Sequence, residues 1–459
     1  MHFKQFYVGC LAHASYLIGD RGVAAVVDPA RDVDMYMEEA RTHGLEIRWV
    51  LETHLHADFV SGHRELAERT GATIGIGAKA EAGYAHRPLR DGDEIPLGGA
   101  LIRVLETPGH TPESVSFVVY AEAGDPEPWG VLTGDTLFVG DVGRVDILSS
   151  RLPVIELAGM MYDSLHRKLL ALPDVTRVYP AHGAGSLCGR SMSSESSSTI
   201  GRERQMNPAL ADHGREAFVA DVTRDVPETP IYFLHSRDLN RTGPRLDAQR
   251  PMPRELDAKE FAAAAAVGGV ILDTRATAAF GVCHPAGALH ASLDGQFASW
   301  VGTLVAPDVP LLLVVEPDRA EEAVMRLARV GYERVEGLLR GGCDAWQRAG
   351  LPTAAVPQLP AESLASGARA VLDVRRQREW DAGHLAGATH VPLAQLRERL
   401  GELERDADWA VICASGYRSG IAASIMLAAG FPRVANAVGG MDACRRAGLP
   451  LAAANSVSA

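Results

Sequence analysis

The sequence predicts a multidomain α/β protein, in which a two-sheet β domain with outer helices precedes two smaller domains that each contain a parallel sheet. The chain has 459 residues, which at roughly 100 to 200 residues per domain corresponds to about three domains. A segment beginning at Leu272 recurs at Leu372, and its matching residues keep the same spacing. Closely spaced strand-like runs fill the N-terminal half, so the two halves of the chain differ in architecture.

The N-terminal half alternates short apolar runs with two amphipathic segments. The predicted strands are 16–18, 24–27, 49–51, 101–105, 115–120 and 131–132, and the predicted helices are 34–42 and 62–70. This order fits two packed sheets with helices outside them. The segment 183–204 is rich in Gly, Ser and Arg, and its Ser-rich run 193–199 favours a flexible linker over an ordered loop.

The C-terminal half consists of two related copies. Both contain Leu-Asp-x-Arg, then a His and a Gly-Ala pair, and both end in Gly-Gly followed by Ala-Gly-Leu-Pro. In each copy short apolar runs alternate with helical patterns, which predicts a parallel sheet with covering helices. The domain boundaries that we expect are 1–255, 256–356 and 357–459.

Composition excludes several classes of protein. The net charge of −13 opposes binding to a phosphate backbone, so no nucleic acid partner is expected. The most apolar stretches, such as 261–272, are shorter than the roughly 18 to 20 residues of a membrane span. The N-terminus lacks the pattern of a secretory signal, which predicts a cytoplasmic protein. Six scattered cysteines predict individual thiols, with Cys283, Cys343 and Cys444 structural.

Metal-ligating residue types stand at four places in the N-terminal half, as expected at strand ends. The residues are His54, His56 and Asp58 in one H-x-H-x-D motif, His110 in PGHT, Asp135 in TGD and His182 in AHG. Each alone is typical of a capping or surface residue. Four His and two Asp in this order together indicate a metal site.

These motifs resemble the metallo-β-lactamase superfold, which implies an αββα sandwich. Hydrolytic members such as glyoxalase II carry a further His after the Asp, and here that position is Phe59. The loss of this imidazole removes a ligand of the second metal, and two His with one carboxylate suit a single non-haem Fe(II). The branch that uses one iron is the persulfide dioxygenases.

The resemblance to the persulfide dioxygenases implies roles for individual residues. It places the iron ligands on His54, His110 and Asp135. The residues that it places around the pocket are His56, Asp58 and His182, together with Arg144 and Asp146 of a G-R-x-D segment. A structural salt bridge is an equally good interpretation of the last pair.

The second copy contains a thiol in an anion-binding type of loop. Cys413 follows a predicted strand and precedes a predicted helix, and four residues separate it from Arg418. Backbone N–H groups at a helix start, with a nearby guanidinium, stabilise an anion and favour a nucleophilic thiolate. The remaining residues of the anion-binding loop are Ala414, Ser415, Gly416, Tyr417 and Ser419.

This loop and the segments upstream of it resemble rhodanese sulfurtransferases, in which the Cys carries a persulfide. A related dual-specificity phosphatase would have one residue more between the Cys and the Arg. The first copy has the same frame but no Cys from Val301 to Gly342, and it carries Glu316 and Asp318 where an anion would bind. We therefore expect the first copy to be an inactive rhodanese with a role in spacing, docking or dimerisation.

The combined resemblance implies an enzyme that oxidises a small-molecule persulfide, such as glutathione persulfide, with O₂ to sulfite at one Fe(II) per chain. Cys413 would transfer sulfane sulfur to form or use thiosulfate in sulfide detoxification. The alternatives are a zinc-dependent thioester hydrolase of the glyoxalase II type and a non-catalytic sulfur carrier or sensor. We expect a homo-oligomer with no membrane partner.

One further thiol follows the last metal motif. Cys188 lies six residues after His182 in a glycine-rich segment, so that it can reach the rim of the metal pocket. It is either a sulfur relay or a small packed side chain, and the sequence favours neither.

Overall fold

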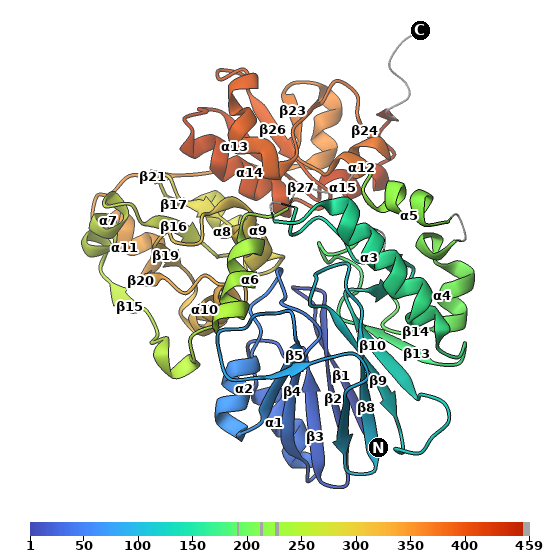
Figure 1. Ribbon diagram of the computed structural model, residues 1–459. Coiled ribbons are helices and arrows are strands. Elements are labelled where there is room, and N and C mark those ends of the chain that lie inside the picture. Colours follow the sequence, from blue (N-terminus) through green and yellow to red (C-terminus); the bar gives the residue numbers. More distant parts are fainter. Residues whose placement is uncertain (150, 191, 212–213, 225–228, 453–459) are drawn as a thin grey trace. The chain divides into compact units, whose positions relative to one another are not determined.

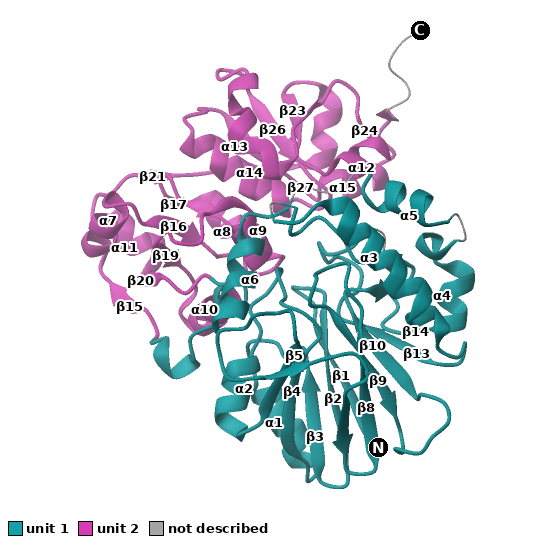
Figure 2. Ribbon diagram, in the orientation of Figure 1, with its two compact units in different colours: residues 1–251, 327–331 teal, residues 252–326, 332–459 magenta. Residues whose placement is uncertain are grey.

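The computed structural model describes residues 1–149, 151–190, 192–211, 214–224 and 229–452 (Figure 1). The chain forms two compact units (Figure 2). Unit 1 comprises Met1–Pro251 and Leu327–Gly331, and unit 2 comprises Met252–Arg326 and Tyr332–Ala459. None of the helices in the described ranges has the length and apolar character needed to span a bilayer.

Unit 1 contains two six-stranded sheets. The first sheet has the order β1 (His2–Val8), β2 (His13–Asp20), β3 (Val23–Val27), β4 (Glu46–Glu52), β5 (Thr73–Gly77), β6 (Arg87–Leu89). The second has the order β14 (Ser198–Thr199), β13 (Arg177–Pro180), β10 (Gly130–Gly134), β9 (Val115–Tyr120), β8 (Ala100–Glu106), β7 (Glu94–Leu97). A small hairpin is formed by β11 (Leu137–Phe138) and β12 (Asp141–Val142).

The core of unit 1 lies between these sheets. Along β2, Tyr16 and Ile18 point into it, with Phe117 and Leu132 of the second sheet on the other side. Leu17 points to the opposite face, where it packs against the helices, as the two-residue period of a strand requires. The helices of unit 1 are α1 (Asp34–Thr42), α2 (His63–Thr70), α3 (Val154–Arg167), α4 (Ile200–Met206), α5 (Gly214–Val222) and α6 (Tyr232–Thr242). The predicted αββα sandwich is confirmed.

The expected linker at 193–199 is corrected in part. Ser198 and Thr199 form β14, which pairs antiparallel with β13 through Val178 and Arg177. The Thr199 hydroxyl caps α4 by accepting the N–H of Arg202 at 3.2 Å. Serine-rich composition predicts flexibility, but here a free strand edge and a helix start provide hydrogen-bond partners.

Unit 2 contains two five-stranded sheets whose neighbouring strands all run parallel, which confirms the predicted repeat fold. The first has the order β15 (Arg254–Leu256), β20 (Val335–Leu339), β19 (Leu311–Val314), β16 (Val270–Asp273), β18 (Leu289–His290). The second has the order β22 (Gln358–Pro360), β27 (Val434–Val438), β26 (Trp409–Ile412), β23 (Ala370–Asp373), β25 (Thr389–His390).

Helices and two-stranded sheets complete each repeat. The first repeat has α7 (Ala258–Ala266), α8 (Thr277–Val282), α9 (Phe297–Leu304), α10 (Ala320–Ala328), α11 (Gly342–Arg348), and β17 (His284–Pro285) paired with β21 (Thr353–Ala354). The second has α12 (Gln377–Asp381), α13 (Leu396–Arg399), α14 (Tyr417–Ala428), α15 (Gly440–Arg446), and β24 (His384–Leu385) paired with β28 (Leu451–Ala452).

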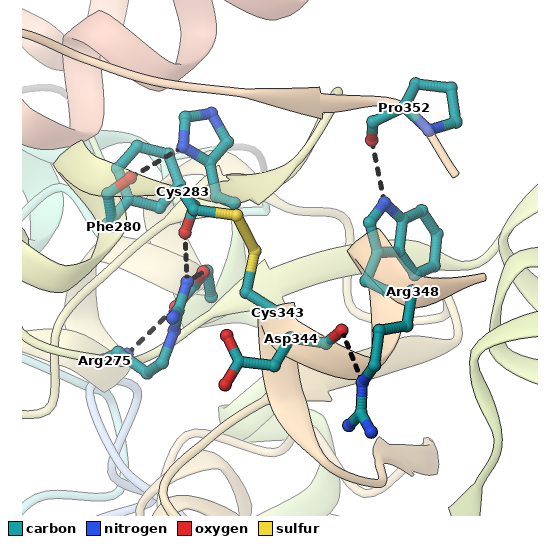
Figure 3. Close-up of a disulfide and its surroundings, with 10 residues drawn as sticks. Arg275, Phe280, Cys283, Cys343, Asp344, Arg348 and Pro352 are labelled. Atoms are coloured by element: carbon teal, nitrogen blue, oxygen red, sulfur yellow. Dashed lines mark hydrogen bonds and ion pairs between the residues drawn. A yellow bond between two sulfur atoms is a disulfide. The ribbon is translucent and has the colours of Figure 1, made fainter. Parts of the chain in front are cut away.

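A disulfide joins Cys283 and Cys343 in the first repeat, which corrects the expectation of individual thiols. Cys283 directly follows α8, and Cys343 lies in the first turn of α11 (Figure 3). The Arg275 guanidinium donates to the Cys283 carbonyl oxygen at 2.7 Å. The two thiols are 60 positions apart, so only the fold of the repeat reveals that they are neighbours.

Replacing both Cys283 and Cys343 with Ser is expected to lower the free energy of unfolding of unit 2 by about 2 to 4 kcal/mol, because the disulfide restricts a long loop in the unfolded chain. Urea unfolding followed by tryptophan fluorescence measures the change. A phosphine reductant should bring the unmodified chain to the stability of the double variant and leave the variant unaffected. Equal midpoints for oxidised chain and variant would contradict the prediction.

Candidate functional site

The six metal-type residues of unit 1 all follow strands of the sandwich and are buried. The residues are His54, His56 and Asp58 after β4, His110 after β8, Asp135 after β10 and His182 after β13. Their ligand atoms form two groups, each with atoms within 4.8 Å of one another. One group is His54, His110 and Asp135, and the other is His56, Asp58 and His182.

The ligand atoms of the first group lie close together. Asp135 Oδ2 lies 3.9 Å from His54 Nε2 and 3.4 Å from His110 Nε2. The Thr53 hydroxyl donates to Asp28 Oδ2 at 2.8 Å, so it accepts from Nδ1–H of His54 at 3.0 Å. These two hydrogen bonds leave Nε2 of His54 deprotonated and directed at the centre of the triad.

The buried polar atoms of this triad fit a metal ion. Within the part of the chain that the structure describes, His54 Nε2 and both carboxylate oxygens of Asp135 have no hydrogen-bond partner. Buried polar atoms without partners are costly unless something occupies the space between them. Burial lowers the pKa of His110 to about 4 and so keeps the imidazole in the neutral form that binds metals. A donor set of two imidazoles and one carboxylate suits Fe(II) or Zn²⁺.

Phe59 directly follows the H-x-H-x-D motif. Its ring is fully buried, with its centroid 4.0 Å from that of His13 and 4.4 Å from that of His56. His56 Nε2 lies 3.1 Å from Asp28 Oδ1 and 3.5 Å from Glu52 Oε2. A nitrogen of His56 in the second group therefore faces carboxylates as well.

The H-x-H-x-D loop is held by residues outside the predicted site. Asn240 of α6 donates to the carbonyl oxygens of His56 and Phe59, both at 2.8 Å, and accepts the N–H of Ser61 at 2.9 Å. No motif near Asn240 in the sequence indicates that it contacts this loop. Asp28 and Glu52 could have been noticed, because each ends an apolar strand on the edge that carries the ligands.

The G-R-x-D segment lies beside the first triad. The Arg144 guanidinium binds both carboxylate oxygens of Asp146, at 2.8 and 2.6 Å, so the pair is a salt bridge. The Arg144 carbonyl oxygen also accepts the Nδ1–H of His110 at 2.7 Å. A Cβ at Gly143 would overlap the Asp135 carbonyl oxygen and lie 3.2 Å from His110 Nδ1, so this close approach requires glycine.

Cys188 lies inside the metal pocket. Its Sγ forms a group with Asp135 and His182 in which all ligand atoms are within 4.8 Å, and its residue is 1% exposed. Its backbone is held by Arg144 N–H, which donates to the Cys188 carbonyl oxygen at 3.0 Å. Burial, with the nearby carboxylate of Asp58, raises the pKa of the Cys188 thiol.

In unit 2, the Cys413 thiol lies in a loop that directs hydrogen-bond donors at it. Cys413 Sγ accepts the N–H of Gly416 at 3.1 Å and the hydroxyl of Ser419 at 3.4 Å. Arg418 is oriented by Glu379, which it contacts through two hydrogen bonds of 2.6 Å. The thiol therefore meets donors at the start of α14, as the loop sequence predicted.

The first repeat lacks this loop. Asp273 pairs with Val314 as Asp373 pairs with Ile412, so Val315 is the counterpart of Cys413. The next residues form a short 3₁₀ turn, Pro317–Arg319, in place of an open loop. Glu316 and Asp318 flank its start, and their negative charge disfavours an incoming anion.

Two family models match the chain. Residues 8–182 match the metallo-beta-lactamase superfamily, and residues 358–447 match the rhodanese-like domain. A solved structure, the metallo-beta-lactamase from Staphylococcus aureus, is 32% identical with a TM-score of 0.65 and covers 73% of this chain and 98% of its own.

Two relatives each match about half of the chain. A probable metallo-hydrolase of Burkholderia pseudomallei is 32% identical over 289 residues, which is 54% of this chain and 94% of the relative. The mitochondrial persulfide dioxygenase ETHE1 of Bos taurus is 30% identical over 203 residues, which is 43% of this chain and 70% of the relative.

Proposed function

The chain belongs to the metallo-β-lactamase superfamily and also carries a rhodanese-like domain, and from this premise we propose that it is a persulfide dioxygenase with a second, sulfurtransferase site. The observation that carries the proposal is the buried His54, His110 and Asp135 triad beside Phe59. A rhodanese-like loop in the same chain supports sulfur as the shared chemistry. Similarity to a persulfide dioxygenase supports it independently.

His54, His110 and Asp135 would hold one Fe(II), and the bound metal would supply O₂ activation. In the overall reaction R–S–SH, O₂ and H₂O give R–SH, sulfite and two protons. The protein residues orient the site. Thr53 and the Arg144 carbonyl oxygen fix the imidazoles through their Nδ1 atoms, and the buried walls exclude bulk water.

Cys413 would carry sulfane sulfur between small molecules. Its persulfide donates the outer sulfur to sulfite, which forms thiosulfate and returns the Cys413 thiolate. The Gly416 N–H and Arg418 would stabilise the negative charge that develops in the loop. The same step run in reverse would use thiosulfate.

Cys188 would accept sulfur inside the metal pocket by exchange with R–S–SH, which gives Cys188–S–SH and R–SH. Cys188→Ser is then expected to lower the yield of thiosulfate from persulfide severalfold with less change in iron content. Mass spectrometry of the unmodified chain should find a persulfide adduct on Cys188. Cys444→Ser, which removes another buried free thiol, is the control. An unmodified Cys188 with unchanged thiosulfate yield in its Ser variant would make it a packing residue.

A zinc-dependent thioester hydrolase is the second candidate. The grouping of His56, Asp58 and His182 favours it, because these three side chains could hold a second ion. Metal analysis of the purified protein distinguishes the two. One iron per chain and no turnover of a glutathione thioester support the dioxygenase, whereas two zinc ions with thioester hydrolysis would overturn it.

A further inference from the structure

Within unit 2, the helix that starts at the Cys413 loop contacts the first repeat. Ser424 of α14 accepts the backbone N–H of His290 at 3.0 Å. One turn earlier, a Cβ at Gly420 would lie 3.0 Å from Thr277 Cγ2 and 3.3 Å from His290 Cδ2. These contacts place α14 directly against the end of β18.

The closest contact is made by Tyr417, which belongs to the loop itself. Its hydroxyl donates to the Ser292 carbonyl oxygen at 2.8 Å. Its ring lies over Gly295, where an added Cβ would be 2.6 Å from Cζ and 2.8 Å from Cδ2 of the tyrosine. Real Cβ atoms do not approach other atoms this closely, so the ring occupies space that only glycine leaves free.

The segment 292–295 that contacts Tyr417 is held by the 3₁₀ turn 317–319 and by α10 of the first repeat. Arg326 of α10 donates to the carbonyl oxygens of Leu293 and Gly295, both at 2.5 Å. Arg319, which ends the 3₁₀ turn, binds Asp294 at 2.8 Å. One arginine at the end of the 3₁₀ turn and one on α10 therefore support the surface on which Tyr417 rests.

We propose that the first repeat is a positioning element for the active loop, and that Tyr417 is the residue through which it acts. The inference rests on the proposed sulfur transfer at Cys413. Tyr417 lies between Gly416, whose N–H reaches the thiol, and Arg418, which pairs with Glu379. A displaced Tyr417 would therefore move both groups that stabilise the sulfur anion.

Gly295→Ala in the full-length chain tests this position without altering the loop. We expect sulfur transfer from thiosulfate to cyanide to fall about tenfold or more, mainly in kcat, because small displacements of a catalytic group cost large factors. The rate at which iodoacetamide alkylates Cys413 should change as well. Gly401→Ala is the matched control, since a Cβ there meets no atom within 4 Å.

Tyr417→Phe removes only the hydroxyl contact to Ser292, and Tyr417→Ala also removes the ring. If Gly295 acts through the ring, adding Gly295→Ala to Tyr417→Ala should cost nothing further. Wild-type transfer and alkylation rates in both Gly295→Ala and Tyr417→Phe would overturn the inference. If the unmodified chain transfers no sulfur, the proposed function fails, and the alkylation rates still decide whether the first repeat positions the loop.

Discussion

His110→Ala is expected to release the metal and abolish O₂ uptake with a persulfide. The variant keeps only one imidazole and one carboxylate of the triad, and the buried carboxylate of Asp135 loses a neighbour at 3.4 Å. Loss of a residue that hydrogen-bonds to a metal ligand already lowers metal affinity or activity roughly 10- to 100-fold. Loss of a ligand itself should therefore lower both by a larger factor. Metal analysis and an oxygen electrode measure the two effects.

His86→Ala is the control for this experiment. His86 lies in unit 1, away from the six metal-type residues in the sequence, and its Nδ1–H donates to the Tyr84 carbonyl oxygen at 2.7 Å. Its replacement should leave metal content and O₂ uptake unchanged. Full metal content and activity in His110→Ala would remove His110 from the ligand set.

Cys413→Ser is expected to end thiosulfate formation while O₂ uptake continues and sulfite accumulates. The hydroxyl of Ser cannot carry a sulfane sulfur, and Cys413 makes no contribution to the triad of unit 1. Chromatography of sulfite and thiosulfate during persulfide oxidation measures the separation of the two activities.

Cys444→Ser serves as the control for this variant. Cys444 is a buried thiol of the same repeat that packs in its apolar core. Its serine variant should form thiosulfate at the wild-type rate. Thiosulfate formation at that rate in Cys413→Ser would mean that another group transfers the sulfur.

Much of the fold could be predicted because its signals are local. Apolar runs end at residues that can bind metal, and parallel or mixed sheets bring such strand ends to one edge. His54, His110 and Asp135 therefore come together although they are far apart in sequence. The Cys413 loop was predictable for the same reason, since its donors come from the next few residues of the chain.

The hydrogen bonds and the disulfide that hold these sites in place could not be predicted, because they join segments that are distant in the sequence. Asn240 holds the carbonyl oxygens of the H-x-H-x-D loop from a helix that follows much later. The disulfide partner of Cys283 and the carbonyl oxygen that receives Tyr417 are equally invisible in the sequence. No pattern within either segment encodes such a pairing.

The most direct test of persulfide oxidation at the metal uses the iron-containing Cys413→Ser variant with glutathione persulfide. The measurement is the O₂ consumed for each sulfite formed. This variant does not convert sulfite to thiosulfate, so all of the sulfite that forms can be quantified. We expect one O₂ to be consumed for each sulfite formed, and no sulfite to form under argon. Persulfide turnover without O₂ uptake, or no turnover with iron present, would contradict it.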